Sequence, residues 1–269
     1  MAELALLDSY RVLIGSRIRS QLAYRSSFAV NTVNAMLLGL LEFTEIYVIL
    51  HNVPTLGGLT LGQAALVFAL GNTAFALADL VFGQLDSIPT YLRMGRLEAF
   101  LVRPMPLMAQ LITADFQLRR IGRAVAGVVI LVVVLTILDL DFSAGTLYLL
   151  VVTPFVGAAI YGALFAAAGG IQFFIIDGAQ FTNSFVYGSS YAGQLPGSVL
   201  LAPMRVLFTF VIPATVTAYL PSLLILGLPG PALLPAWLGW WAPLFAVSVW
   251  ALAAVAWRSG VRRFTGAGG

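Results

Sequence analysis

The chain of 269 residues contains no cysteine and no lysine, and His51 is its one histidine. Without cysteine, disulfides and thiolate metal sites are excluded. Without lysine, the chain has no Walker A loop, because the lysine of that loop reaches the bound phosphates. Gly122–Gly127, GRAVAG, is glycine-rich, but small residues at the start of an apolar run favour close helix packing instead. No cluster of residues for a metal or for a catalytic centre remains.

Charge is also scarce. Only 9% of the residues are charged, 60% are hydrophobic and the mean hydropathy is +0.97, whereas a soluble domain carries about 25% charged residues. Several runs reach the roughly 20 apolar residues that a helix needs to span a bilayer. They do not alternate as the strands of an outer-membrane barrel do. The composition therefore predicts an all-α integral membrane protein.

Six transmembrane helices are predicted, in a single transmembrane domain that covers residues 1–269. Their approximate bounds are 27–50, 61–83, 121–138, 145–171, 199–220 and 238–257. Prolines crowd the chain from late span five to span six, where a straight helix cannot hold them. These prolines are Pro213, Pro221, Pro229, Pro231 and Pro235. We therefore expect a broken or re-entrant outer segment between spans five and six.

All fourteen basic residues are arginines, and with six spans each of them falls on the same side of the membrane. Chance clustering is the alternative, but the positive-inside rule makes that side the cytoplasm. The segments 1–26, 84–120 and 258–269 are then cytoplasmic, and both termini are inside a multi-pass plasma-membrane protein. Because the arginines follow the span ends, they form no folded basic face for nucleic acid.

The stretch YLRMGRLEAFLVRP, residues 91–104, lies in the first long cytoplasmic loop. As one helix it would place Arg93, Arg96 and Arg103 within an arc of about 80°. Such an amphipathic helix either lies on anionic head groups or docks on a cytoplasmic partner.

Polar residues interrupt the first span. Asn31, Asn34, Glu42 and Glu45 lie within it, and two carboxylates at the bilayer centre cost roughly 5–7 kcal/mol. Since Glu42 and Glu45 share a helix face, we expect that face to turn away from lipid. Asn34, Glu42 and Glu45 then either line a path that favours cationic cargo, or the acids are protonated or bonded to polar neighbours.

Two further acids lie near the cytoplasmic side. We expect Asp79, near the end of span two, to pair with a cytoplasmic arginine. Asp177 lies in the second cytoplasmic connection, either in an interfacial segment or in a second contact with a partner. Its aromatic neighbours there are Phe173, Phe174, Phe181 and Phe185.

Three stretches resemble six-span permeases of the ABC type-2 exporter family. The first is MGRLEAFLVRPMPLMAQ, from residue 94. The second is residues 175–227, with a Tyr-Gly pair, FVIP and Tyr219-Leu220-Pro221. The third is the ending GVRRFTGAGG. The three occur in the same order as in that family and cover most of the chain.

The resemblance implies that residues 88–103 form a coupling helix that docks in a separate ATP-hydrolysing subunit. The residues implied in this coupling are Arg93, Gly95, Arg96, Glu98, Arg103 and Pro104, with Asp177 as a second contact. It also implies a second, identical or related permease subunit. ATP and magnesium would bind the ATPase, so this chain would need no cofactor and would not be an enzyme.

The function predicted from the sequence is that of a permease subunit in a bacterial ABC exporter. It would form half of the path for an amphiphilic or lipid-like cargo, and Glu42 and Glu45 would favour a cationic one. The alternative is a proton-coupled secondary carrier that uses the same two acids as a relay. A membrane enzyme acting on lipids is disfavoured by the lack of a His/Asp/Glu cluster.

Overall fold

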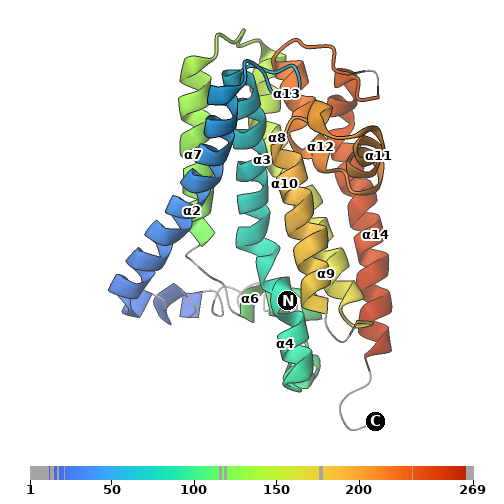
Figure 1. The fold of residues 1–269 in the computed structure, drawn as a ribbon. Helices are drawn as coiled ribbons and strands as arrows, with labels where there is room; N and C mark the ends of the chain where they lie inside the picture. Colours follow the sequence, from blue (N-terminus) through green and yellow to red (C-terminus); the bar gives the residue numbers. More distant parts are fainter. Residues whose placement is uncertain are drawn as a thin grey trace.

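The chain folds into an upright bundle of helices (Figure 1). The structure is a computed structural model that describes residues 12, 15–16, 18–20, 22–114, 117, 120–175, 178–231 and 233–264, a few of them in the backbone only. Most of these residues are helical, and no strand forms among them. The long helices are α2 (Arg25–Asn52), α3 (Leu61–Phe82), α7 (Arg120–Ile137), α8 (Ala144–Ile171) and α14 (Ala242–Arg263). The predicted all-α architecture is confirmed.

Helix α3 is the centre of the bundle. It packs against α2, α7, α8 and the shorter α10 (Gly188–Gln194), while α14 packs on α8. A capping box between Thr60 and Gln63 starts α3, which satisfies two of its first backbone N–H groups. Its sequence is apolar on nearly every side, and all residues from Ala64 to Ala76 are buried. A helix of this composition is expected to be enclosed by others.

Glycines mark the closest approaches between helices. A Cβ atom on Gly122 of α7 would lie 2.3 Å from the Thr32 carbonyl oxygen of α2, and one on Gly127 would lie 2.8 Å from the Thr73 hydroxyl of α3. One on Gly170 of α8 would lie 2.6 Å from backbone atoms of α14. Only glycine fits such contacts without a shift. The GRAVAG segment therefore packs helices, as predicted.

The predicted spans agree with the long helices at most positions. Four stretches of the described residues are long and apolar enough to cross a membrane, and a fifth counts if one bent pair is a single span. The four are 61–93, 120–137, 144–171 and 236–263. The first predicted span coincides with α2, which is not among these stretches, although its 28 residues extend about 42 Å at 1.5 Å per residue. The chain is thus a multi-span membrane protein.

The predicted fifth span, about 199–220, is not a straight helix. Helix α11 (Ala202–Val206) continues into the π-helical η4 (Leu207–Val211), and α12 (Ala214–Thr217) with α13 (Tyr219–Ile225) follows after a bend of 66°. Between them, Ile212 has φ −120° and ψ 89°. Pro213 explains the break, because proline disfavours helical backbone at the residue before it.

A helical segment inside the bundle replaces part of the predicted second cytoplasmic connection. Helices α9 (Gly178–Thr182), η2 (Asn183–Tyr187) and α10 follow one another, and they lie beside α3 and α8 (Figure 1). The ring centroids of Tyr187 and Phe75 of α3 are 5.5 Å apart. The sequence predicted that this segment belongs to a cytoplasmic connection, and beyond residue 177 this prediction was wrong. Its Ser, Gly and Asn residues lower the mean hydropathy, so hydropathy alone does not indicate a helix inside the bundle.

Candidate functional site

We define residues 88–104 as the tip. It projects from the lower end of the bundle in Figure 1, where α4 is labelled. It contains α4 (Ile88–Arg93) and α5 (Glu98–Leu101), joined by a turn. The expectation of one continuous helix over about 88–103 was therefore wrong. As a consequence, its arginines do not share a single helical face.

A glycine ends the first helix of the tip. Gly95 has φ +63°, a left-handed conformation that glycine adopts readily. The Gly95 N–H donates to the Leu92 carbonyl at 3.2 Å and the Arg96 N–H to the Tyr91 carbonyl at 3.0 Å. These two bonds form a Schellman motif, in which a left-handed residue closes the helix.

Buried side chains hold the tip against the bundle. Leu97 is fully buried, and the rings of Tyr91 and Phe100 meet edge to face at 5.4 Å. From α6 (Leu107–Ala114), the Gln110 side-chain amide donates to the carbonyls of Phe100 at 3.0 Å and Met105 at 2.8 Å. The tip is thus a defined structure and not an open loop.

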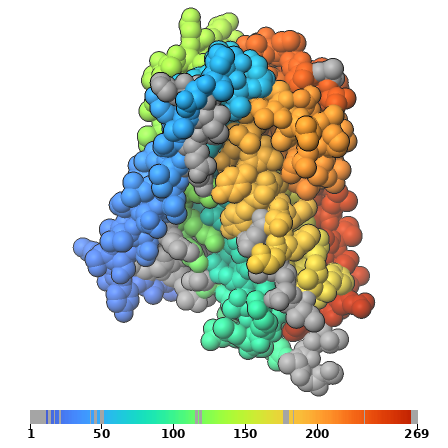
Figure 2. All heavy atoms as spheres, viewed as in Figure 1, coloured from blue at the N-terminus to red at the C-terminus, as the bar shows by residue number. Residues whose placement is uncertain are grey.

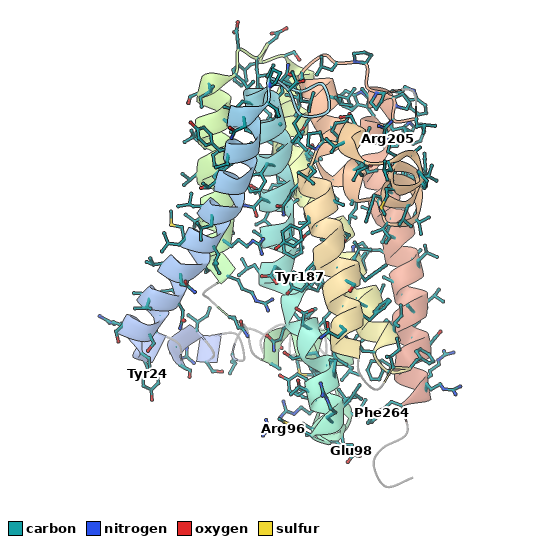
Figure 3. The ribbon with its side chains drawn as sticks, viewed as in Figure 1. Tyr24, Arg96, Glu98, Tyr187, Arg205 and Phe264 are labelled. Atoms are coloured by element: carbon teal, nitrogen blue, oxygen red, sulfur yellow. The ribbon has the colours of Figure 1, made fainter. Side chains whose placement is uncertain are left out.

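The outer surface of the tip mixes charged and apolar side chains. Arg96 and Glu98 lie near its extremity (Figure 3), Val102 is 83% exposed and Met94 61% exposed. The remaining residues that the resemblance implicated, Arg93, Gly95, Arg103 and Pro104, are exposed as well. Exposed apolar side chains rimmed by charges are typical of a surface that binds another protein or a membrane.

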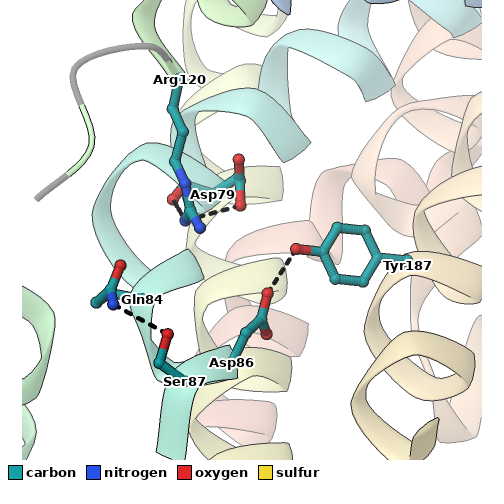
Figure 4. A network of polar contacts seen from close by, with 6 residues as sticks. All are labelled: Asp79, Gln84, Asp86, Ser87, Arg120 and Tyr187. Carbon is teal, nitrogen blue, oxygen red and sulfur yellow. Dashed lines mark hydrogen bonds and ion pairs between the residues drawn. The ribbon is translucent and has the colours of Figure 1, made fainter. Parts of the chain in front are cut away.

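A polar network lies at the end of α3, just before the tip begins (Figure 4). Arg120, the first residue of α7, forms an ion pair of 2.9 Å with the Asp79 carboxylate and donates a hydrogen bond of 2.6 Å to the Asp79 carbonyl. Asp79 thus pairs with an arginine, as expected. In η1 (Gly83–Ser87), the Asp86 carboxylate accepts a hydrogen bond of 2.5 Å from the Tyr187 hydroxyl of η2. All three contacts involve a charged group and are among the stronger kinds, so they fix α3 and η1 just before the tip begins.

A polar cavity of about 430 Å³ lies between α2, α3, α7 and the η2–α10 segment. In the space-filling view the surface is hollowed between α2, in blue, and α10, in yellow (Figure 2). Its lining residues are Asn31, Asn34, Ala35, Leu38, Asp79, Arg120, Arg123, Tyr187 and Tyr191. Asn34, one of the predicted path residues, is therefore at a cavity wall. The two arginines and the two tyrosines were not predicted as site residues.

The acidic path residues lie further along α2. Glu42 and Glu45 belong to this helix, but their side chains are outside the described part of the structure. Asp177 also lies outside the described residues. The roles of all three stay predictions.

Arg205 corrects the predicted charge distribution. It lies at the end of the bundle opposite to Arg96 (Figure 3), so the fourteen arginines are not all on one side. Its guanidinium donates to the carbonyls of Leu200 at 2.7 Å and Ser198 at 2.6 Å. These carbonyls lie in the irregular segment before α11, and the arginine satisfies them where no regular helix does.

The fold and the site together define a multi-span helical membrane protein with a projecting tip and a polar cavity near the same end. Residues 36–268 match the family model described as ABC-2 family transporter protein. Since this match covers most of the chain, the protein belongs to the ABC-2 transporter family, and the resemblance to an ABC type-2 permease is confirmed. Members of this family are membrane transport components that work with ABC ATPase subunits. Comparisons with curated proteins and with solved structures gave no match.

Proposed function

We propose that this chain is the permease subunit of an ABC exporter. It forms half of a translocation path, and a second permease subunit, identical or related, forms the other half. ATP and Mg²⁺ bind to separate ATPase subunits, because the chain contains no lysine for a Walker A loop. The permease itself carries out no catalysis.

The observation that carries this proposal is the tip, a compact projection at the end of α3. Its outer surface offers exposed charged and apolar side chains, while Leu97 and Gln110 anchor it to the bundle. A force applied to such an anchored element passes to α3 and, through Asp79 and Arg120, to α7. We infer that the ATPase docks here, with Arg93, Gly95, Arg96, Glu98, Arg103 and Pro104 at the contact.

We further propose six crossings, with the tip and both termini in the cytoplasm. The six are α2, α3, α7, α8, the segment from α9 to α13, and α14. An even number of crossings returns the chain to the side where it began, and Tyr24 and Phe264 indeed lie at the same end as Arg96 (Figure 3). Arginines gather at that end, which the positive-inside rule assigns to the cytoplasm.

Co-purification tests the docking of an ATPase. The tagged chain is expressed with its untagged chromosomal neighbours, and we expect a protein with a Walker A lysine to co-purify with it. Arg96→Glu reverses an exposed charge of the tip, and a loss of about 1.4 kcal/mol would reduce the recovered ATPase about tenfold. The matched control is Arg258→Glu, an exposed arginine of α14, which should change nothing. Recovery of a lone chain that still transports would contradict the proposal.

The cargo of the proposed exporter is an amphiphilic or lipid-like molecule. This follows from the apolar helices that enclose the path and from the family. The predicted preference for a cationic cargo rests on Glu42 and Glu45 alone, and replacing both by Gln tests it. Unchanged export of a cationic substrate by that variant would reject a path role for the two acids.

A further inference from the structure

The hydrogen bond between Asp86 and Tyr187 joins two parts of the chain that are far apart in the sequence. Asp86 belongs to η1, which ends at Ser87, and the tip begins at the next residue. Tyr187, the last residue of η2, lies 101 residues further along the chain, and its hydroxyl donates to the Asp86 carboxylate at 2.5 Å. Figure 4 shows its side chain pointing from η2 toward η1. The base of the tip is thus attached directly to the helical segment inside the bundle.

The same tyrosine belongs to the wall of the polar cavity. Tyr187 and Tyr191, one helical turn further on, both line the cavity. The Tyr187 ring meets the ring of Phe75 in α3 at 5.5 Å and the ring of Phe165 in α8 at 6.0 Å, both edge to face. Aromatic pairs prefer this geometry, so the two rings define where the hydroxyl lies. One side chain therefore connects the base of the tip, the centre of the bundle and the cavity.

The segment that carries Tyr187 has a backbone form that can change. Helix η2 is a single π-helical turn between α9 and α10, and such turns are rare and frequently occur at functional sites. Because a π-helical turn holds more residues than an α-helical one, rewinding it would rotate α10 and Tyr191 relative to α9. A Cβ atom on Gly188, the first residue of α10, would meet nothing within 4 Å. Among the described residues, no atom packs there to oppose a small movement.

A second buried tyrosine provides a comparison. Tyr161 of α8 is fully buried, and its hydroxyl shares a hydrogen bond of 3.1 Å with the hydroxyl of Thr217 in α12. That bond joins two neutral groups and lies outside the tip and η1. The bond of Tyr187 has a carboxylate as its acceptor, which makes it the stronger kind. The two tyrosines therefore separate a role in linking the tip from a role in stability alone.

We propose that Tyr187 is a positioning residue, which transmits movement of the tip to the wall of the polar cavity through its hydrogen bond to Asp86. When the tip moves, η1 moves with it, because α4 begins directly after η1. The Asp86 carboxylate then displaces the Tyr187 hydroxyl, and η2 and Tyr191 follow. This inference rests on the proposed function, since the docked ATPase supplies the movement of the tip.

The reactivity of a thiol in the cavity wall measures this movement. The chain contains no cysteine, so Tyr191→Cys gives the permease one thiol. The permease is purified with its ATPase, and fluorescein maleimide labels it without nucleotide or with Mg²⁺ and a slowly hydrolysed ATP analogue. We expect the analogue to change the labelling rate of the permease about tenfold, the size of effect that one hydrogen bond to a charged group can transmit.

Three variants in the Tyr191→Cys background assign the effect to the bond. Tyr187→Phe keeps the ring and removes the hydroxyl, so the change in rate should disappear while the ATPase still co-purifies. Asp86→Asn keeps a side-chain oxygen that accepts the hydroxyl, so most of the change should remain. Tyr161→Phe is the matched control, because it also removes a tyrosine hydrogen bond, and the change should remain in full. If Tyr187→Phe does not fold, Asp86→Ala breaks the same bond from the other side.

The results distinguish the coupling from the proposed function. If the ATPase co-purifies but the analogue changes the rate equally with and without the Tyr187 hydroxyl, the coupling is overturned and the proposed function stands. An analogue that leaves the rate unchanged in the Tyr191→Cys chain would also overturn the coupling. Equal losses in Tyr187→Phe and Tyr161→Phe would indicate general destabilisation and overturn the specific role. A failure to recover any ATPase would contradict the proposed function itself.

Discussion

Asp79 and Arg120 show how much a single pair of charges contributes at the residue scale. Their side chains are only 12% and 15% exposed, so most of each charge is removed from water. In such a pair, each charge compensates for the lost hydration of the other. Removing one partner therefore costs much more than replacing both.

A double-mutant cycle measures this coupling. Arg120→Leu leaves the Asp79 carboxylate without its guanidinium and should lower the free energy of unfolding by about 3 kcal/mol. The double variant Asp79→Leu/Arg120→Leu should recover most of that loss, because neither charge of the pair is left buried without the other. Thermal unfolding of the purified chain in detergent reports both values. A double variant no more stable than the single one would show that the charges are not coupled.

Single residues were predictable to different degrees. The arginine partner of Asp79 followed from the cost of an isolated acid near a membrane span. Arg120 and Arg123 were counted only among the arginines near span ends, although residues three apart share a helix face and thus indicated one wall of a site. Arg205 was placed on the wrong side because hydropathy depends on composition alone. The two carbonyls that its guanidinium binds lie in the segment before α11, and hydropathy does not predict the conformation of that segment.

At the scale of helices, small residues decide which elements lie in direct contact. Gly170 of α8 and Gly260 of α14 face each other, and a Cβ on Gly260 would lie 2.1 Å from the Gly170 carbonyl oxygen. Backbone atoms cannot move aside as a flexible side chain does. An added methyl group must therefore push the two helices apart.

Two alanine substitutions compare a tight and an open position. Gly170→Ala should lower the free energy of unfolding by about 1–3 kcal/mol, as overpacking does in closely packed interiors. Gly188→Ala in α10, where an added Cβ would meet nothing within 4 Å, should be neutral or raise it by up to about 1 kcal/mol through helix propensity. Melting temperatures in the same detergent give the comparison. Equal effects of the two substitutions would contradict the packing at Gly170.

Elements with strong local signals were foreseen, and those that depend on their surroundings were not. The apolar helices followed from hydropathy, and prolines such as Pro213 predicted a broken outer segment. The turn at Gly95 had a signal as well, because a glycine after an apolar turn is a common helix end. The helical segment 178–194 had no such signal. Its hydroxyl side chains are typical of a loop in the sequence, but in the structure they form hydrogen bonds inside the bundle. Ser189, for example, donates to the Val186 carbonyl at 2.7 Å.

At the scale of the whole molecule, the arrangement of the ends makes the orientation testable. Because the chain contains no cysteine, one introduced thiol is unique. Arg96 lies at the tip, whereas Val53 follows α2 in the loop at the other end and is 39% exposed. The two positions should therefore face opposite compartments.

Labelling of intact cells with a membrane-impermeant maleimide distinguishes the two orientations. Val53→Cys should react with the reagent added outside, and Arg96→Cys should react only after the membrane is permeabilised. Denatured protein serves as the control for full reactivity of both thiols. Labelling of Arg96→Cys in intact cells would place the tip outside, where no ATPase could reach it.

The contact between Gly170 and Gly260 also limits how this subunit can change shape. Because backbone atoms of α8 and α14 are in direct contact here, a change of side-chain rotamer cannot make room for one helix to slide past the other. In any conformational change, α8 and α14 should therefore move together as one rigid body. Relative motion must then occur at interfaces that are less closely packed. The interface between α2 and α3 borders the polar cavity, so motion there would change the shape of the cavity around a transported molecule.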